Sequence, residues 1–235
     1  MHILVIAGAH VEAEFREKFG QAHTYTFWEP GSARAHEDNE NKVGITIVES
    51  QRTSPLQNPP DVVFIFKFQG LGSLELSSKC FIFKEASQTA SWGSFPGGAT
   101  FGFCGLPTLL NRRLLEVSLY HEADRAKLAE TCAALGTDYR VVADRVGLVT
   151  PRVICMIINE ACFTVQEGTA TMQDVDLGMQ LGTSYPRGPF AWANAIGVER
   201  VYAVLEAMWH DTHDERYKVC PLLKRQALRG EPFAV

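Results

Sequence analysis

The start of the chain has the residue types and spacing of a cofactor site. A short apolar strand, His2–Ala7, runs directly into a helix. There a dinucleotide-binding fold places one glycine for the tight turn, a second for the approach of the pyrophosphate, and a third small residue for helix–strand packing. The three positions are Gly8, His10 and Ala13, and Glu29 ends the next strand, where an acid would hold the ribose hydroxyls. The His10 imidazole occupies space that a diphosphate needs. The pattern predicts either a degenerate dinucleotide site or a strand–turn–helix that binds nothing.

The cysteines and the remaining histidines do not have the spacing of a metal site. The six cysteines include no C-x-x-C pair, and we expect reduced thiols, mostly in the core, rather than disulfides. His210 and His213, with Asp211 and Asp214, follow a long amphipathic helix, where a solvated polar end explains them better than a metal ion. We therefore predict no metal site.

Composition is that of an ordinary globular protein and excludes several classes of partner. The 235 residues are 46% hydrophobic and 21% charged, which argues against disorder. The formal net charge of −5 gives no reason to expect nucleic acid or a membrane surface as a partner. No apolar run approaches the roughly 20 residues of a membrane helix, and the first residues lack the basic start of a signal peptide. We expect a cytoplasmic protein.

Up to about residue 145, short strands alternate with chain breakers. Two helices are predicted in this half, Val11–Phe19 and Glu122–Leu135, and two polar loops, Gly31–Lys42 and Ser54–Pro60. Because a strand, a helix and a strand open the chain, we expect a Rossmann-like α/β domain over residues 1–145, with a sheet that is at least partly parallel. Eight segments rich in Val, Ile, Phe and Tyr are the predicted strands: His2–Ala7, His23–Glu29, Val43–Glu49, Val62–Phe68, Cys80–Lys84, Thr100–Cys104, Leu114–Leu119 and Tyr139–Ala143.

From Val146 onward the predicted strands stop and helices follow. Thr150 is a candidate N-cap with Pro151 at the first helical position, and Thr171 with Asp174 has the spacing of a capping box. The helical faces are wide and apolar, so a bundle or a subunit interface should cover them. We expect an all-α domain over residues 146–235. Its five predicted helices span residues 152–167, 172–182, 189–196, 199–210 and 221–228.

Four motifs of this helical half occur in an order and spacing that resemble a known family. They are MIINEA at 156–161, EGTAT-x-x-D-x-D at 167–176, LG-x-x-YP-x-GPF at 181–190 and PLL-x-R at 221–225. Residues 146–228 resemble the C-terminal domain of 3-hydroxyacyl-CoA dehydrogenases. The resemblance implies a Rossmann domain, shortened in this chain relative to the family, followed by a helical dimerisation domain, and hence a homodimer. It also implies NAD as cofactor, an acyl-CoA as ligand, and oxidation of a 3-hydroxyacyl-CoA in fatty-acid β-oxidation.

The resemblance implies catalytic positions that this chain fills only in part. In the family a His–Glu pair acts on the hydroxyl, assisted by a Ser and an Asn. Glu116 stands where the family has its His-orienting carboxylate, and Ser87 is the match for the Ser. About twelve residues before Glu116 the chain has Phe103 and Cys104 but no His, and Pro151 replaces the Asn. Because alcohol oxidation needs a base within hydrogen-bond reach, and a cysteine is a base only as a thiolate, these departures remove the expected chemistry. Without an imidazole to orient, Glu116 is better explained by pairing with a local Arg.

Three functions remain open from the sequence. The first is a homologue of these dehydrogenases that has lost hydride transfer and keeps the dimer scaffold. The second is an active NAD-dependent dehydrogenase whose site is rebuilt with other residues, such as His10. The third is a module that binds a CoA ester or a nucleotide, or pairs with another subunit, without chemistry. The departures favour the first and the third. We therefore expect the catalytic and cofactor positions to be vestigial and no cofactor to bind tightly, NAD being the candidate if one does.

Overall fold

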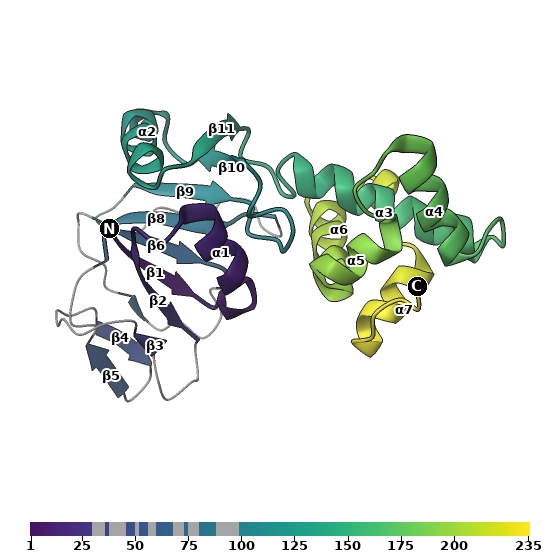
Figure 1. The fold of residues 1–235 in the computed structure, drawn as a ribbon, viewed down its shortest axis with the longest axis horizontal. Coiled ribbons are helices and arrows are strands. Elements are labelled where there is room, and N and C mark those ends of the chain that lie inside the picture. Colours follow the sequence, from purple (N-terminus) through teal and green to yellow (C-terminus); the bar gives the residue numbers. More distant parts are fainter. Residues whose placement is uncertain are drawn as a thin grey trace. The chain divides into compact units, whose positions relative to one another are not determined.

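The computed structural model describes residues 1–29, 60–67, 80–87 and 99–235, and the backbone of four short strands between residues 36 and 74 (Figure 1). The chain divides into two compact units. The first contains the described residues up to Asp144, apart from Ser87 and Leu106–Leu109, and these join Arg145–Val235 in the second.

A sheet of eight strands lies at the centre of the first unit, in the order β11-β10-β9-β8-β6-β1-β2-β3. Five of its strands, from β9 across to β2, run parallel to one another, whereas β10 pairs antiparallel with β9 and β3 antiparallel with β2. A smaller sheet has the order β5-β4-β7. The strands are β1 (His2–Ile6), β2 (Thr24–Trp28), β3 (His36–Glu37), β4 (Thr46–Glu49), β5 (Arg52–Pro55), β6 (Val62–Ile65), β7 (Ser73–Leu74), β8 (Phe81–Glu85), β9 (Thr100–Phe103), β10 (Leu114–Leu119) and β11 (Asp138–Val142).

The central strands are apolar on both faces, as buried parallel strands are. Alternate residues of β1 therefore belong to two cores. Val5 packs in the core that also holds Phe15 of helix α1 (Glu12–Phe19) and Leu128 of helix α2 (Arg125–Ala134). Leu4 packs in the core of the opposite face. Both helices thus cover the same face, and each follows a short 3₁₀ turn, η1 (Ala9–Val11) and η2 (Glu122–Asp124).

The prediction of a Rossmann-like α/β half followed by an all-α half is confirmed. The predicted opening is present as well, since β1 and β2 are parallel neighbours joined through α1. The two predicted loops are wrong in part, because Gly31–Lys42 contains β3 and Ser54–Pro60 contains the end of β5. Strands as short as these show too little alternation to be recognised from sequence. Most other residues of both loops, and residues 43–45 of the predicted third strand, lie outside the described part of the chain.

The second unit is helical. Its helices are α3 (Thr150–Gln166), α4 (Met172–Thr183), α5 (Pro189–Ile196), α6 (Val198–Thr212) and α7 (Pro221–Arg229), with a 3₁₀ turn η3 (Glu215–Tyr217) before α7. The capping box of α4 is confirmed, with Thr171 Oγ1 accepting the Asp174 N–H at 3.1 Å. The predicted Thr150 cap is wrong. Gly147 and Leu148 both have positive φ, and α3 starts one residue early, with Val149 as N-cap. Among the described residues, no helix combines the length and apolarity needed to cross a membrane.

Candidate functional site

The turn after β1 holds the first of the predicted cofactor residues. Gly8 lies in this turn, but the left-handed residue is Ala7, with φ of 56°, whereas Gly8 has φ of −119°. Gly8 is required for another reason. A Cβ at this position would lie 2.5 Å from Val5 Cγ1 and 2.7 Å from Phe66 Cδ2. The absence of a side chain at Gly8 therefore leaves space for Val5 and the Phe66 ring, and the position does not require a left-handed backbone conformation.

Phe66 directly follows β6, and its ring packs against the core on the α1 face of the sheet. Its ring lies so close to a second glycine that a Cβ on Gly105 would be 2.5 Å from Phe66 Cε1. The ring also packs edge-on against His10 and Phe103, with centroids 5.5 and 5.3 Å apart. Open parallel sheets bind their ligands in the crevice outside these carboxyl ends. In this chain the Phe66 ring lies against Gly8 and Gly105, the residues that follow β1 and β9 closely.

Glu29 and the loop before α1 are joined by a hydrogen bond. Glu29 Oε1 accepts the Ala9 N–H at 2.9 Å, so the predicted ribose-binding acid and a loop amide that a pyrophosphate would approach bind each other. Glu12 and Glu14 stand in the first turn of α1, where negative charge opposes the anion binding of a helix N-terminus. The prediction that Ala13 packs between helix and strand is wrong. Ala13 is exposed, and Val11 and Phe15 are the buried residues of this segment.

The predicted catalytic positions are only partly brought together. Glu116 is buried in the middle of β10, and its carbonyl oxygen accepts the Cys104 N–H at 3.3 Å. Phe103 and Cys104 therefore lie beside Glu116 and Val117 of the neighbouring strand. Phe103 is fully buried in an aromatic cluster with Phe64 and Phe66, and it offers no base. Ser87 is buried and belongs to the second unit.

A buried polar group that we did not predict lies on the sheet face away from α1 and α2. Lys84 of β8 is 7% exposed, and burial lowers its pKa to about 8, against the opposing influence of Asp144. Ser118 Oγ donates to Asp144 Oδ1 at 2.9 Å. Gly102 lies between Lys84 and Ser118 in the sheet and leaves the space over itself to the serine hydroxyl. The signal in the sequence was a lysine inside the apolar strand FIFKE.

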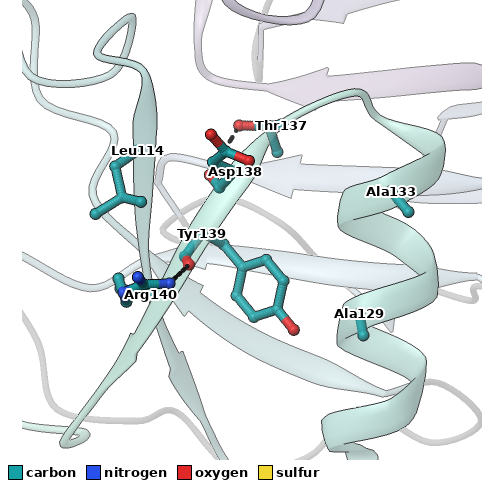
Figure 2. Close-up of a pocket in the computed structure, with 7 residues that line it drawn as sticks. All are labelled: Leu114, Ala129, Ala133, Thr137, Asp138, Tyr139 and Arg140. Atoms are coloured by element: carbon teal, nitrogen blue, oxygen red, sulfur yellow. Dashed lines mark hydrogen bonds between the residues drawn. The ribbon is translucent and has the colours of Figure 1, made fainter.

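A groove of about 440 Å³ lies beside the edge strand β11 (Figure 2). Tyr139 points toward Ala129 of α2, and Arg140 donates to the Tyr139 carbonyl at 3.3 Å (Figure 2). Arg113 pairs with Asp138 at 3.3 Å. None of the predicted site residues lines this groove. In the described ranges of the chain, no three His, Cys, Asp or Glu side chains form a group that could hold a metal ion.

Comparison with known sequences concerns the helical unit. Residues 147–232 match the family model "3-hydroxyacyl-CoA dehydrogenase, C-terminal domain". The helical unit therefore resembles the C-terminal domain of these dehydrogenases. It is 44% identical over 87 residues to 3-hydroxyadipyl-CoA dehydrogenase of Escherichia coli, a match that covers 37% of this chain and 18% of that protein. It is 37% identical over 89 residues to a probable 3-hydroxybutyryl-CoA dehydrogenase of Bacillus subtilis, covering 38% of this chain and 31% of that protein. The chain matches less than a third of the length of either relative.

Solved structures resemble the whole chain at low sequence identity. FadB2 of Mycobacterium tuberculosis superposes with a TM-score of 0.67 at 17% identity, covering 97% of this chain and 93% of that one. The (S)-3-hydroxybutyryl-CoA dehydrogenase PaaH1 of Ralstonia eutropha gives 0.66 at 16% identity, covering 97% and 94%. This likeness establishes the fold of both units.

The motifs that carry the family resemblance hold helices together. Asp176 of the D-x-D motif accepts the N–H groups of Phe190 and Ala191 at 2.8 and 2.9 Å, which caps α5. Asn159 of MIINEA accepts the Cys220 N–H at 2.8 Å and donates to the Lys218 carbonyl at 2.9 Å. These side chains fix the packing of the helical domain. These motif residues therefore have a structural role in this chain.

Proposed function

We propose that this chain keeps the scaffold of a 3-hydroxyacyl-CoA dehydrogenase and has lost tight NAD binding and hydride transfer. The observation that carries the proposal is the Phe66 ring, which packs against Gly8, Gly105 and His10 in the crevice where a Rossmann-like sheet binds its ligand. The Glu29–Ala9 hydrogen bond supports it, because the acid and the amide are each other's partners. The positions Gly8, His10, Ala13 and Glu29 are in this proposal vestigial.

The catalytic positions give independent support. Hydride removal from a secondary alcohol requires a base within reach of the hydroxyl proton. Next to Glu116 the chain offers the buried Phe103 ring and the buried Cys104. Pro151, at the position of the family's Asn, lies in the first turn of α3 and has no polar side-chain atom. Glu116 and Ser87 are accordingly proposed to be remnants of a catalytic set.

The activity assay uses acetoacetyl-CoA and NADH, followed by the absorbance of NADH. We expect no turnover above the background, since loss of the general base alone removes about 10²- to 10⁴-fold. The variant Cys104→His should not restore turnover, because cofactor binding fails first. Ordinary dehydrogenase turnover by the unmodified protein, at a rate of about 1 s⁻¹ or more, would contradict the proposal.

We also propose that the helical unit joins two copies of the chain, and that an acyl-CoA is the ligand class to test first. Three apolar side chains of α3 and α4 support the pairing, since Val153, Leu177 and Leu181 are 51%, 55% and 78% exposed. A second copy related by a two-fold axis is the simplest cover for these exposed side chains.

The acyl-CoA proposal depends on the family match alone.

A further inference from the structure

Two guanidinium groups of the helical unit meet at one phenol oxygen. Arg152 Nη1 donates to Tyr217 Oη at 2.5 Å, and Arg216 Nη2 donates to the same oxygen. The two guanidinium carbons lie 5.3 and 4.6 Å from the centroid of the Tyr217 ring. Tyr217 itself is buried. Two positive charges therefore share one neutral acceptor.

No carboxylate of the described residues lies within ion-pair distance of either guanidinium. The nearby acids have other partners. Asp211 pairs with Arg145 at 3.3 Å, and Glu215 pairs with Lys218 at 3.6 Å. Asp214 Oδ1 accepts the backbone N–H of Arg216 at 3.0 Å and so caps η3. The positive charge at Tyr217 is left uncompensated by this unit.

The Arg152 side chain is held in place by the backbone before α3. Its Nε donates to the Leu148 carbonyl at 3.3 Å, and its Nη2 donates to the Val146 carbonyl. Arg216 is different, because it is exposed and its one side-chain hydrogen bond to the described residues goes to Tyr217. A guanidinium has five N–H donors. Most of the Arg216 donors are therefore available to a molecule that arrives from solvent.

We propose that Arg152, Arg216 and Tyr217 form a binding site for a phosphate group. The Arg216 guanidinium presents a planar set of donors that matches the oxygens of a phosphate. Arg152, whose three side-chain nitrogens already donate within the unit, adds its positive charge and its remaining N–H groups, and a dianion compensates both charges. Tyr217, which is 3% exposed, accepts from both arginines and so holds the two guanidinium groups at one point. The site depends on the helical unit alone, so it is independent of the proposed loss of NAD binding. The phosphate can be free or carried by a larger molecule such as CoA.

The test is a calorimetric titration with inorganic phosphate at constant ionic strength. The unmodified protein should bind phosphate saturably, and Arg216→Gln should weaken the binding at least tenfold. Arg216→Lys keeps the charge without the planar donors and should weaken it less. The matched control is Lys218→Gln, which removes an exposed cation two residues away that is already paired, and it should bind as the unmodified protein does.

A second titration separates the sources of the phosphate. If CoA carries it, CoA should bind more tightly than dephospho-CoA, and Arg216→Gln should abolish the difference. If the site takes free phosphate, inorganic phosphate should bind saturably while CoA shows no advantage over dephospho-CoA. The proposal is overturned if the unmodified protein binds neither phosphate nor CoA saturably. It is also overturned if Arg216→Gln and Lys218→Gln weaken binding equally, since that result indicates a diffuse charge effect.

Discussion

At the scale of single residues, two glycines and one aromatic ring decide what the crevice can hold. Gly8 and Gly105 are the neighbours that Phe66 requires, and neither glycine needs a positive φ. A sequence pattern shows a glycine after a strand, but it does not show whether the cleared space receives a pyrophosphate or a side chain of the same protein. The position of Phe66, directly after β6, carries no sequence signal of where its ring points. The sequence therefore identifies Gly8 as a candidate residue, but it does not identify Phe66 as the side chain that packs against it.

The contact between Gly8 and Phe66 can be measured by a double-mutant cycle. Gly8→Ala places a Cβ against Val5 and Phe66, and we expect it to lower the free energy of unfolding by about 1–3 kcal/mol in urea denaturation. In a Phe66→Ala background the cost should be smaller, though not zero, because the Val5 contact remains. An equal cost of Gly8→Ala in both backgrounds would show that the two side chains do not compete for this space.

The buried Lys84 predicts a specific dependence of stability on pH. Its pKa is about 8 in the folded chain, against 10.5 for an ordinary lysine. Between these values the unfolded chain binds more protons than the folded one, so stability should rise with pH through this window. Compared with Lys84→Met, the unmodified protein should gain up to about 3 kcal/mol from pH 8 to pH 10.5. Urea denaturation of both proteins across this range is the measurement, and parallel curves would contradict the assignment.

At the scale of elements, the motifs of the helical unit have roles in helix packing. Asp176 accepts two N–H groups at the start of α5, and Gly188 leaves no room there for a side chain, since a Cβ would lie 2.2 Å from Asp176 Cγ. We expect Asp176→Ala to lower the free energy of unfolding by about 2–4 kcal/mol, because two N–H groups at the start of α5 lose a charged acceptor. Thr171→Ala, which removes an exposed cap, should cost about 1 kcal/mol. Equal costs of the two changes in urea denaturation would contradict this account of the motif.

The elements also mark the limits of sequence-based prediction. The parallel opening β1–α1–β2, the five helices of the second unit and the Thr171 capping box follow from apolar spacing and local hydrogen bonding, and all were predicted. The start of α3 was misplaced because the backbone conformation of Gly147 and Leu148, which depends on tertiary packing, begins the helix early. Strand patterning treats the segment around Lys84 as apolar, so it does not predict a buried lysine there. Structure that depends on neighbouring residues can be predicted from the sequence, whereas contacts between distant residues, such as Phe66 with Gly105, cannot.

At the scale of the whole molecule, the exposed apolar residues of α3 and α4 predict association. Light scattering at micromolar concentration should give twice the chain mass of 26.1 kDa. Leu177→Lys combined with Leu181→Lys should yield a monomer, because both side chains are already exposed in a single copy. Charged substitutions of Ile157 or Phe163, which are half-buried, should instead lower solubility. Leu114→Lys, at an exposed position in the first unit, is the control and should leave the mass unchanged. A monodisperse monomer of the unmodified protein would contradict the proposed pairing.

The most direct test of the central claim is a calorimetric titration of the unmodified protein with NADH. If Phe66, His10 and the Glu29–Ala9 hydrogen bond occupy the cofactor crevice, no saturable binding should be detected at affinities tighter than about 100 μM. Any binding of NADH through its phosphates at Arg152 and Arg216 should be weakened at least tenfold by Arg216→Gln. A saturable NADH titration with a Kd below about 100 μM, unaffected by Arg216→Gln, would contradict the account and favour an active dehydrogenase with a rebuilt site.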